Sequence, residues 1–315
     1  MKKVYVLPPQ EDWIVDRMTR EWNEGNPDMS VFTPKTADIV WLLADWCWQG
    51  LWHVGLLKDK KVLTTVHHIV PEKFGDMERA DFELRDVITT AYHVFNQHTY
   101  DFIRPLTLKP IHLVKYWANQ HLWRPTGTRE ELRKKHGLPQ EAFLVGSFQR
   151  DTEGRGIAHG IFEPKLEKGP DKLVEYLKTL KQFRDRADLF DVAERKDVHV
   201  VLAGWRRQYV IENLKKHGVP YTYFDRPNIE VINELYQCLD QYAVTARQEG
   251  GPQALIECGL LGIPVVSTPV GIAEQVLPPS AICDDVFMAA PDVPNVEDWK
   301  LPGGFEPYRE LLQNL

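Results

Sequence analysis

The alternation of short β-rich runs with longer helical patterns constrains this chain more than any other feature. In the first half, "KVYVLP" and "KKVLTTVHHIV" are typical of buried strands. A second series consists of "AFLVGSF" (142–148), "DVHVVLAGW", "PYTYF", "YAVTAR" and "IPVVST". Between two of these runs, "PDKLVEYLKTLKQF" places Leu173, Leu177 and Leu180 on one helical face. Strands separated by such helices predict parallel sheets in an α/β fold.

The chain length predicts more than one hydrophobic core. A chain of 315 residues usually splits into two domains. The turn residues of "WRPTGT" precede a helix whose start carries a predicted capping box, formed by Thr128 and Glu131. The predicted parts are an N-terminal domain over 1–125, a C-terminal domain over 126–305 and a terminal helix over 306–315. The segment "TADIVWLLADW" fits either a strand or a buried helix, because its periodicity does not separate the two.

The composition excludes several classes of function. A net charge of −7 and a pI of about 5.9 give no general attraction to nucleic acid or to an anionic membrane. The cysteines are scattered without a CxxC pair, which argues against a disulfide framework and a structural zinc site. No apolar run approaches the roughly 20 residues of a membrane span, and the start does not resemble a signal peptide. We expect a cytoplasmic protein, and peripheral attachment to the inner face of a membrane is compatible with this expectation.

The stretch "RQEGGPQALIECG" (247–259) joins a predicted strand to a predicted helix. Gly250 and Gly251 lack side chains, so a phosphate group can approach their backbone closely. Pro252 stands in the first turn of the helix, where backbone amides have no intrahelical partner and the helix dipole adds partial positive charge. We expect this turn, with Gln253, to bind an anion such as a diphosphate.

Two glutamates flank the glycine turn. Glu257 falls within the helix, on the side that it shares with Gly250 and Gln253, where its carboxylate can accept hydrogen bonds from a ribose diol. Glu249 precedes the turn, on the far side of the phosphates, where an attached sugar would project. Two glutamates at this spacing are common, but a pair that encloses Gly-Gly-Pro between a strand and a helix is much rarer. We predict that Glu257 binds the nucleoside end of a ligand and Glu249 its sugar end.

These residues resemble the group 1 (family 4) retaining glycosyltransferases. The hallmark of that family is Glu-x7-Glu, here Glu249 and Glu257, followed by a "G-x-P-V-V" strand and a loop with another glutamate, here "GIPVV" and "GIAE" with Glu274. A second signature, a strand ending near Gly-Arg and a later Lys-Gly before a helix, corresponds to "LVGSFQRD" and "PKLEKGPDKLVEYL". The resemblance covers residues 142–278, while residues 1–125 match only in their strand–helix layout.

The resemblance implies the GT-B fold. In this fold two Rossmann-like α/β domains face each other across a cleft, the N-terminal domain lies on the acceptor side and the C-terminal domain binds the nucleotide sugar. The C-terminal helix is expected to cross back to the first domain.

In the family, an arginine and a lysine bind the donor diphosphate and take the place of a metal ion. The matching residues are Arg150 and Lys168, although the insertion "DTEGRGIAHGIFE" separates them and leaves Lys165 as an alternative lysine. Glycosyl transfer builds negative charge on the departing diphosphate, and preorganised cations stabilise that charge selectively. No Asp-x-Asp follows a strand in the way that metal-dependent transferases require. We therefore expect neither a metal nor another cofactor.

Two further loops of the C-terminal domain are candidate parts of the donor site. The segment "GWRRQ" replaces the usual Gly-Asp-Gly, and its Arg206 and Arg207 fit either a phosphate contact or a solvated loop. The loop that contains Tyr223, Phe224 and Arg226 is expected to contact the base of the nucleotide, since backbone groups in this place usually bind the base edge.

The N-terminal half offers two histidines and many aromatic side chains. His67 and His68 follow a predicted strand, and ligands bind at the carboxyl ends of strands in open α/β sheets. Because side chains alternate along a strand, only one of them can face the cleft, and the alternative role is a buried histidine bonded to backbone. Tryptophans at positions 13, 22, 41, 46, 48 and 52 are expected mostly in the core, with one or two stacked on a sugar acceptor.

These features predict a retaining glycosyltransferase that moves a sugar from a UDP- or GDP-sugar to a hydroxyl acceptor in a glycan, glycolipid or other polysaccharide precursor. The expected mechanism is metal-independent front-face transfer, in which the leaving phosphate takes the acceptor's proton and Glu249 orients the donor sugar. The alternatives are a non-hydrolysing nucleotide-sugar 2-epimerase of the same layout and a catalytically silent glycan- or nucleotide-sugar-binding protein. Only an epimerase would interconvert free donors without an acceptor. No nucleic-acid partner is expected.

Overall fold

The computed structural model describes residues 1–11, 14–53, 55–185 and 197–315. Two compact units make up the chain, Met1–Trp117 with Asp298–Leu315 and Ala118–Glu297. Within these described residues, no helix is both long enough and apolar enough to cross a lipid bilayer.

The unit boundaries differ from those predicted, at 117 rather than 125 and at 297 rather than 305. The segment "WRPTGT" belongs to the second unit because the Thr126 amide donates to Oε1 of Gln237 (2.8 Å), and Asn233 Nδ2 donates to the Arg124 carbonyl (3.0 Å). Residues 298–305 belong to the first unit because Phe305 packs edge-on against Trp22, with ring centroids 5.6 Å apart. Turn composition placed the connection at "WRPTGT", which lies inside the second unit, and only these long-range contacts assign its residues.

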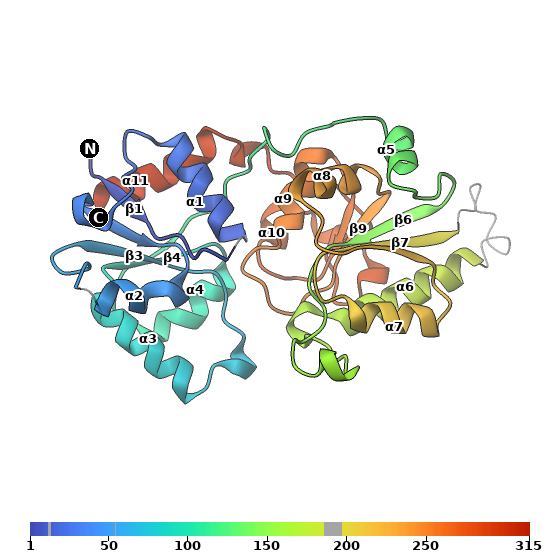
Figure 1. Ribbon diagram of the computed structural model, residues 1–315, viewed down its shortest axis with the longest axis horizontal. Helices are drawn as coiled ribbons and strands as arrows, with labels where there is room; N and C mark the ends of the chain where they lie inside the picture. Colours follow the sequence, from blue (N-terminus) through green and yellow to red (C-terminus); the bar gives the residue numbers. More distant parts are fainter. Residues whose placement is uncertain (12–13, 54, 186–196) are drawn as a thin grey trace. The chain divides into compact units, whose positions relative to one another are not determined.

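A parallel sheet with strand order β1-β2-β3-β4-β5 forms the centre of the first unit. Its strands are β1 (Val4–Val6), β2 (Ile39–Leu42), β3 (Lys61–Val66), β4 (Ala91–Val94) and β5 (Ile111–Leu113). Its helices are α1 (Ile14–Gly25), α2 (Trp48–His53), α3 (Asp76–Ile88), α4 (Gln97–Ile103) and α11 (Glu306–Asn314). In Figure 1, α1 and α11 cover one face of the sheet, and α2, α3 and α4 cover the other. The segment "TADIVWLLADW" contains β2, so the strand alternative is correct.

Aromatic side chains fill both faces of the first sheet. On the α1 and α11 side, Trp41 of β2 packs against Trp22 and Tyr308, with ring centroids 5.3 and 5.5 Å away. On the opposite side, Trp48 packs in a cluster with Val40 and Leu42, whose side chains alternate with that of Trp41 along β2. Core packing is thus confirmed for three of the tryptophans, while Trp46 is 40% exposed. Trp13 and the side chain of Trp52 lie outside the described part of the chain.

The second unit is also built on a parallel sheet, with strand order β10-β9-β6-β7-β8. Its strands are β6 (Phe143–Ser147), β7 (Val198–Ala203), β8 (Tyr221–Phe224), β9 (Gln241–Val244) and β10 (Val265–Ser267). Its helices are α5 (Arg129–Lys135), α6 (Pro170–Asp185), α7 (Gln208–Lys216), α8 (Ile229–Gln237), α9 (Gln253–Leu261) and α10 (Ala273–Val276). Figure 1 shows α6 and α7 on one face and α8 and α9 on the other. The predicted capping box at Thr128 and Glu131 is confirmed at the start of α5.

The strand order of the second sheet reverses next to β6. This strand pairs with β7 on one side and with β9 on the other. The connections that leave β6 and β9 therefore run in opposite directions along the sheet. In open parallel sheets, ligands bind at such a switch point, outside the carboxyl ends of the strands. The topology thus selects the loops after β6 and β9 as the place to search for a site.

Gly169 closes the loop before α6 and holds it against the end of β9. Its φ is +58°, and a Cβ atom at this position would lie 1.8 Å from the Thr245 carbonyl oxygen. The Thr245 hydroxyl also donates to the Gly169 carbonyl at 2.9 Å. Gly169→Ala should therefore lower the free energy of unfolding by more than about 2 kcal/mol, since backbone strain adds to a steric clash. Denaturant unfolding measures this change.

A matched control isolates the effect of the clash. Gly218 has a similar φ of +61°, but a Cβ atom there would meet nothing within 4 Å. Gly218→Ala should therefore cost only the strain of the left-handed conformation, about 1 kcal/mol. Equal losses in the two variants would show that the contact between Gly169 and Thr245 contributes nothing.

Candidate functional site

Lys168 and Glu249 meet at the switch point of the second sheet. Lys168 comes from the loop before α6 and Glu249 from the loop after β9, yet Lys168 Nζ lies 2.5 Å from Glu249 Oε1. Both side chains are 15% exposed. Gln149, which follows β6, donates from Nε2 to the Lys168 carbonyl at 2.7 Å. Three loops that are distant in the sequence therefore place a cation and a carboxylate side by side at the carboxyl edge of the sheet.

The two candidate lysines, Lys165 and Lys168, pair with different carboxylates. Lys165 Nζ forms an ion pair with Glu167 Oε1 at 2.7 Å, away from Glu249. The Glu167 carbonyl in turn accepts the backbone amides of Arg247 and Gln248, at 2.8 and 3.0 Å, which fixes the loop against the end of β9. Of these two lysines, Lys168 is the one that contacts Glu249.

The glycine turn leads directly into α9. The helix begins at Gln253, with Pro252 as its N-cap residue rather than its first helical residue. Gly271, after β10, packs beneath the turn, where a Cβ atom would lie 2.9 Å from Pro252 Cδ and 3.1 Å from the Glu249 carbonyl oxygen. The predicted "GIAE" loop thus supports the turn through its glycine, while its Glu274 is exposed in the first turn of α10.

Glu257 lies in an aromatic cluster that the sequence analysis missed. Its carboxylate is buried and accepts a hydrogen bond from the Tyr236 hydroxyl at 2.7 Å. The ring of Tyr236 packs against those of Phe148 and Tyr242, with centroids 4.7 and 5.4 Å apart. Burial, and then the charge of Glu257, raises the pKa of the Tyr236 phenol. No local motif marks these rings, because they come together only when α8 packs beside α9.

The two neighbouring arginines after β7 have different environments. The guanidinium of Arg207 is fully buried, with Nε 2.6 Å from Asp151 Oδ2 and one terminal nitrogen 3.1 Å from the Ala203 carbonyl. Arg207 therefore ties the loops after β6 and β7 together. Its buried guanidinium, paired with Asp151, fits neither alternative predicted from the sequence, a phosphate contact or a solvated loop. Arg206 lies partly exposed at the surface, over the ring of Trp205.

The loop after β8 lies beside the loop after β7. The Tyr223 hydroxyl is 2.9 Å from both the Gly204 carbonyl and Asp225 Oδ1. Burial and Asp225 raise the pKa of Tyr223 to about 12. Phe224 contacts the His136 ring, and the side chain of Arg226 is 69% exposed. Tyr223 thus connects two loops at the carboxyl edge, while Arg226 projects into solvent.

His67 and His68 directly follow β3 in the first unit, and both are partly exposed. Nε2 of His67 lies 2.9 Å from the Leu43 carbonyl, and Nδ1 lies 3.4 Å from the Tyr116 hydroxyl. Burial lowers the pKa of His67, and the charge of Asp45 partly opposes this effect. His67 is thus a neutral ring that donates to a backbone carbonyl, which is the alternative to a ligand-binding role that the sequence left open.

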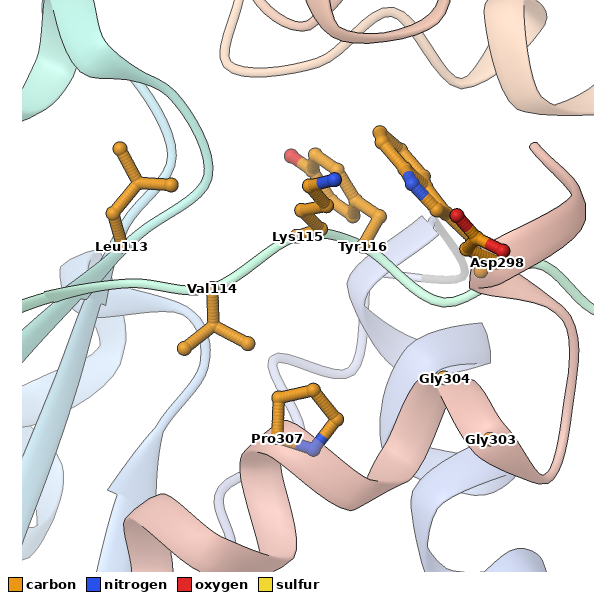
Figure 2. Close-up of a pocket in the computed structure, with 9 residues that line it drawn as sticks. Leu113, Val114, Lys115, Tyr116, Asp298, Gly303, Gly304 and Pro307 are labelled. Carbon is orange, nitrogen blue, oxygen red and sulfur yellow. The ribbon is translucent and has the colours of Figure 1, made fainter. Parts of the chain in front are cut away.

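A pocket of about 230 Å³ lies in the first unit, close to the end of β5. Figure 2 shows it between the loop of Leu113–Tyr116 and the C-terminal segment that carries Asp298, Gly304 and Pro307. The ammonium group of Lys115 lies 5.8 Å from the centroid of the Trp299 ring. This pocket belongs to a different unit from the loops that carry Lys168 and Glu249.

The described residues contain no group of three or more His, Cys, Asp and Glu side chains placed to hold a metal ion. The charged groups that do meet at the carboxyl edge of the second sheet suit an anionic ligand. A lysine, a glycine turn and the start of a helix lie together, beside two carboxylates with different surroundings.

Comparison with known proteins bears on the family and on the fold. Residues 160–295 match the family model described as "Glycosyl transferases group 1". No curated protein matches the sequence.

Solved structures match the fold over most of the chain at low sequence identity. HepE from Anabaena, solved with UDP and glucose, is similar over 100% of both chains, with a TM-score of 0.76 and 11% identity. WaaG, a glycosyltransferase involved in lipopolysaccharide biosynthesis, has a TM-score of 0.58 and 14% identity, over 86% of this chain and 82% of WaaG. Sucrose-phosphate synthase from Thermosynechococcus elongatus has a TM-score of 0.58 and 14% identity, over 88% of this chain and 66% of the synthase.

The family match falls in the second unit, which contains Lys168 and Glu249. Both halves of the chain are parallel α/β units of the Rossmann type, as the sequence predicted. The family match covers Lys168, the glycine turn and both glutamates of the Glu-x7-Glu pair. Residues 160–295 are thus a group 1 glycosyltransferase domain, in a chain with the fold of the GT-B glycosyltransferases.

Proposed function

We propose that the protein is a retaining glycosyltransferase that uses a nucleotide-diphosphate sugar and needs no metal ion. The contact between Lys168 and Glu249 at the switch point carries this proposal. In the proposed arrangement, Lys168 binds the diphosphate and Glu249 the start of the attached sugar. Both residues lie inside the part of the chain that matches the glycosyltransferase model. The complexes of HepE with UDP and with UDP-glucose support a uridine nucleotide as the first donor to test.

In the proposed mechanism, Lys168, Arg150 and the start of α9 stabilise the charge that develops on the leaving diphosphate. The glycine turn lets the phosphates approach the backbone. Glu249 binds hydroxyl groups of the donor sugar and stabilises positive charge on its ring. The leaving phosphate accepts the proton of the attacking hydroxyl on the same face, which retains the configuration at the anomeric carbon.

We further propose that the first unit binds a hydroxyl acceptor. His67 and His68 stand at a strand end in a parallel sheet, the position where such folds bind ligands. The half-exposed Trp46 lies near His67, with ring centroids 6.2 Å apart, and its indole N–H donates to Glu11 at 3.0 Å. A sugar can stack its C–H face on an aromatic ring held in this way.

Calorimetric titration with UDP, GDP and ADP tests the donor side of the proposal. One nucleotide should bind clearly better than the others. The corresponding nucleotide sugars, incubated with glycan and glycolipid acceptors in EDTA, should release that nucleotide and form a product of retained configuration. Product formation only after Mg²⁺ or Mn²⁺ is restored would contradict metal independence, and an inverted product would contradict the retaining mechanism.

The two glutamates should affect different steps. Glu257→Gln should weaken binding of the free nucleotide by about 1.5–3 kcal/mol with little change in kcat, because ribose contacts are the same in the ground and transition states. Glu249→Gln should lower kcat while nucleotide affinity stays at or above the wild-type value, because Lys168 loses its neutralising partner. Nucleotide titration and initial-rate kinetics measure both quantities.

Tyr236→Phe is the control for Glu257→Gln, because it removes a hydrogen bond to the same carboxylate without changing the charge. It should retain most of the nucleotide affinity. The roles would be reversed if Glu249→Gln abolished nucleotide binding while Glu257→Gln bound normally and turned over slowly.

A further inference from the structure

Trp205, in the loop after β7, has the guanidinium groups of two arginines near its ring. The guanidinium carbon of Arg206 is 3.9 Å from the centroid of the indole ring, and that of Arg150 is 5.3 Å from it. Trp205 is 46% exposed, so part of its ring surface is accessible from solvent. Arg150 follows β6 and Arg206 follows β7, so the indole joins cations from two neighbouring strand ends.

The backbone beneath this cluster is rigidly held. The Arg206 carbonyl accepts the amides of Asp151 and Thr152, both at 3.1 Å. Its φ of +59° is an uncommon conformation for a residue with a side chain, and the buried pair of Arg207 and Asp151 secures the same loops. Gly154 leaves room for the cation, since a Cβ atom there would lie 2.4 Å from a terminal nitrogen of Arg206. These contacts position the guanidinium of Arg206 more tightly than a solvated surface loop would.

The positive charges in this cluster are not neutralised by direct partners. Among the described residues, neither Arg150 nor Arg206 forms an ion pair with a carboxylate. Burial and the neighbouring Arg206 lower the pKa of Arg150, while Glu153 and Glu167 oppose this effect. A cation–π contact holds a guanidinium in place without cancelling its charge, whereas a carboxylate would do both. Two like charges are thus held close together, an arrangement that an anion would stabilise.

We propose that Trp205, Arg150 and Arg206 form an anion-binding subsite that takes the diphosphate of the donor, with Trp205 as a positioning residue for both guanidiniums. This inference rests on the proposed function and adds a cation and a positioning residue to it. The loop that carries Arg150 contacts the loop that carries Lys168, because Gln149, which precedes Arg150, donates to the Lys168 carbonyl. Together these groups supply the positive charge for which other transferases use a metal ion.

Pyrophosphate is the probe, because it carries the diphosphate without a base or a sugar. Calorimetry should show that Trp205→Leu weakens pyrophosphate binding roughly 3- to 30-fold, the range of cation–π contacts, and Trp205→Phe should restore most of it. The affinity of Trp205→Leu should also depend less on salt, because its arginines are less well placed. Phe32→Leu removes an exposed aromatic ring of the first unit that belongs to neither proposed site, and it should bind pyrophosphate like the wild type.

Arg206→Gln tests the subsite without changing Trp205, in case the tryptophan variants fold poorly. It should weaken pyrophosphate binding to a similar degree. Unchanged affinity in a folded Trp205→Leu, equal losses in the Leu and Phe variants, or no pyrophosphate binding to the wild type would each overturn the inference. A different result would contradict the proposed function without contradicting the subsite. A chain that transfers no sugar from any donor, but loses pyrophosphate affinity in Trp205→Leu, retains the subsite without the reaction.

Discussion

Replacing Lys168 by alanine should lower kcat/KM by roughly 30- to 1,000-fold, or about 2–4 kcal/mol of transition-state stabilisation. The physical reason is that the ammonium group would oppose charge that grows on the diphosphate only as the glycosidic bond breaks. Folding should change little, because the side chain is partly exposed and its backbone contacts, including the bond from Gln149, remain. Steady-state kinetics with the best donor measures the effect, and thermal unfolding checks stability.

Lys165→Ala is the matched control. Lys165 has the same charge and lies in the same loop, but it pairs with Glu167 rather than with Glu249. We expect its activity to remain within about threefold of the wild type, since it would make no contact that changes in the transition state. Similar losses in both variants, or a larger loss in Lys165→Ala, would remove Lys168 from the proposed diphosphate site.

Replacing Arg207 by methionine should lower the free energy of unfolding by about 3–5 kcal/mol, because it leaves the carboxylate of Asp151 buried without its charged partner. The two side chains are 0% and 1% exposed, so water cannot replace the lost contact without opening the loops. Denaturant unfolding of the full chain, followed by tryptophan fluorescence, measures the loss. Nucleotide affinity measured well below the unfolding transition should change much less.

A double variant and a solvent-exposed ion pair serve as controls for the loss in Arg207→Met. The double variant Asp151→Leu/Arg207→Met removes both charges and should regain part of the lost stability. The pair of Arg247 and Asp171 has similar geometry, at 2.6 Å, but its side chains are 37% and 38% exposed. Arg247→Met should therefore cost less than about 1 kcal/mol. A loss from Arg207→Met no larger than this would mean that the buried pair does not hold the loops together.

Much of the fold was predictable because its signals are local. Apolar runs bounded by turn residues predicted all strands of the second sheet but only β1 and β3 of the first, where β2 was left open and β4 and β5 were not predicted. One amphipathic segment predicted α6 from its first residue, Pro170. The capping box at Thr128 and the terminal helix that follows residue 305 were also correct. Each of these features depends on residues within a few positions of one another, where side-chain periodicity and capping chemistry act directly.

The candidate site was predictable only in part. The glycine turn and the two glutamates lie within one short stretch, so their arrangement on a strand, a turn and a helix follows from spacing. The choice between Lys165 and Lys168 did not follow from spacing, because the partner, Glu249, is 81 residues away from Lys168. Gly169, pressed against Thr245, is what brings this loop to β9.

By itself, the sequence determined two parallel α/β halves, the turn at the switch point and the family resemblance, because periodicity and short motifs are properties of neighbouring residues. Only the tertiary structure decided that Arg207 is buried while Arg206 lies on Trp205, and that Tyr236 holds Glu257. Adjacent arginines look alike in a sequence. Their roles separate when one side chain loses its water and must find a carboxylate, while the other keeps its charge at the surface.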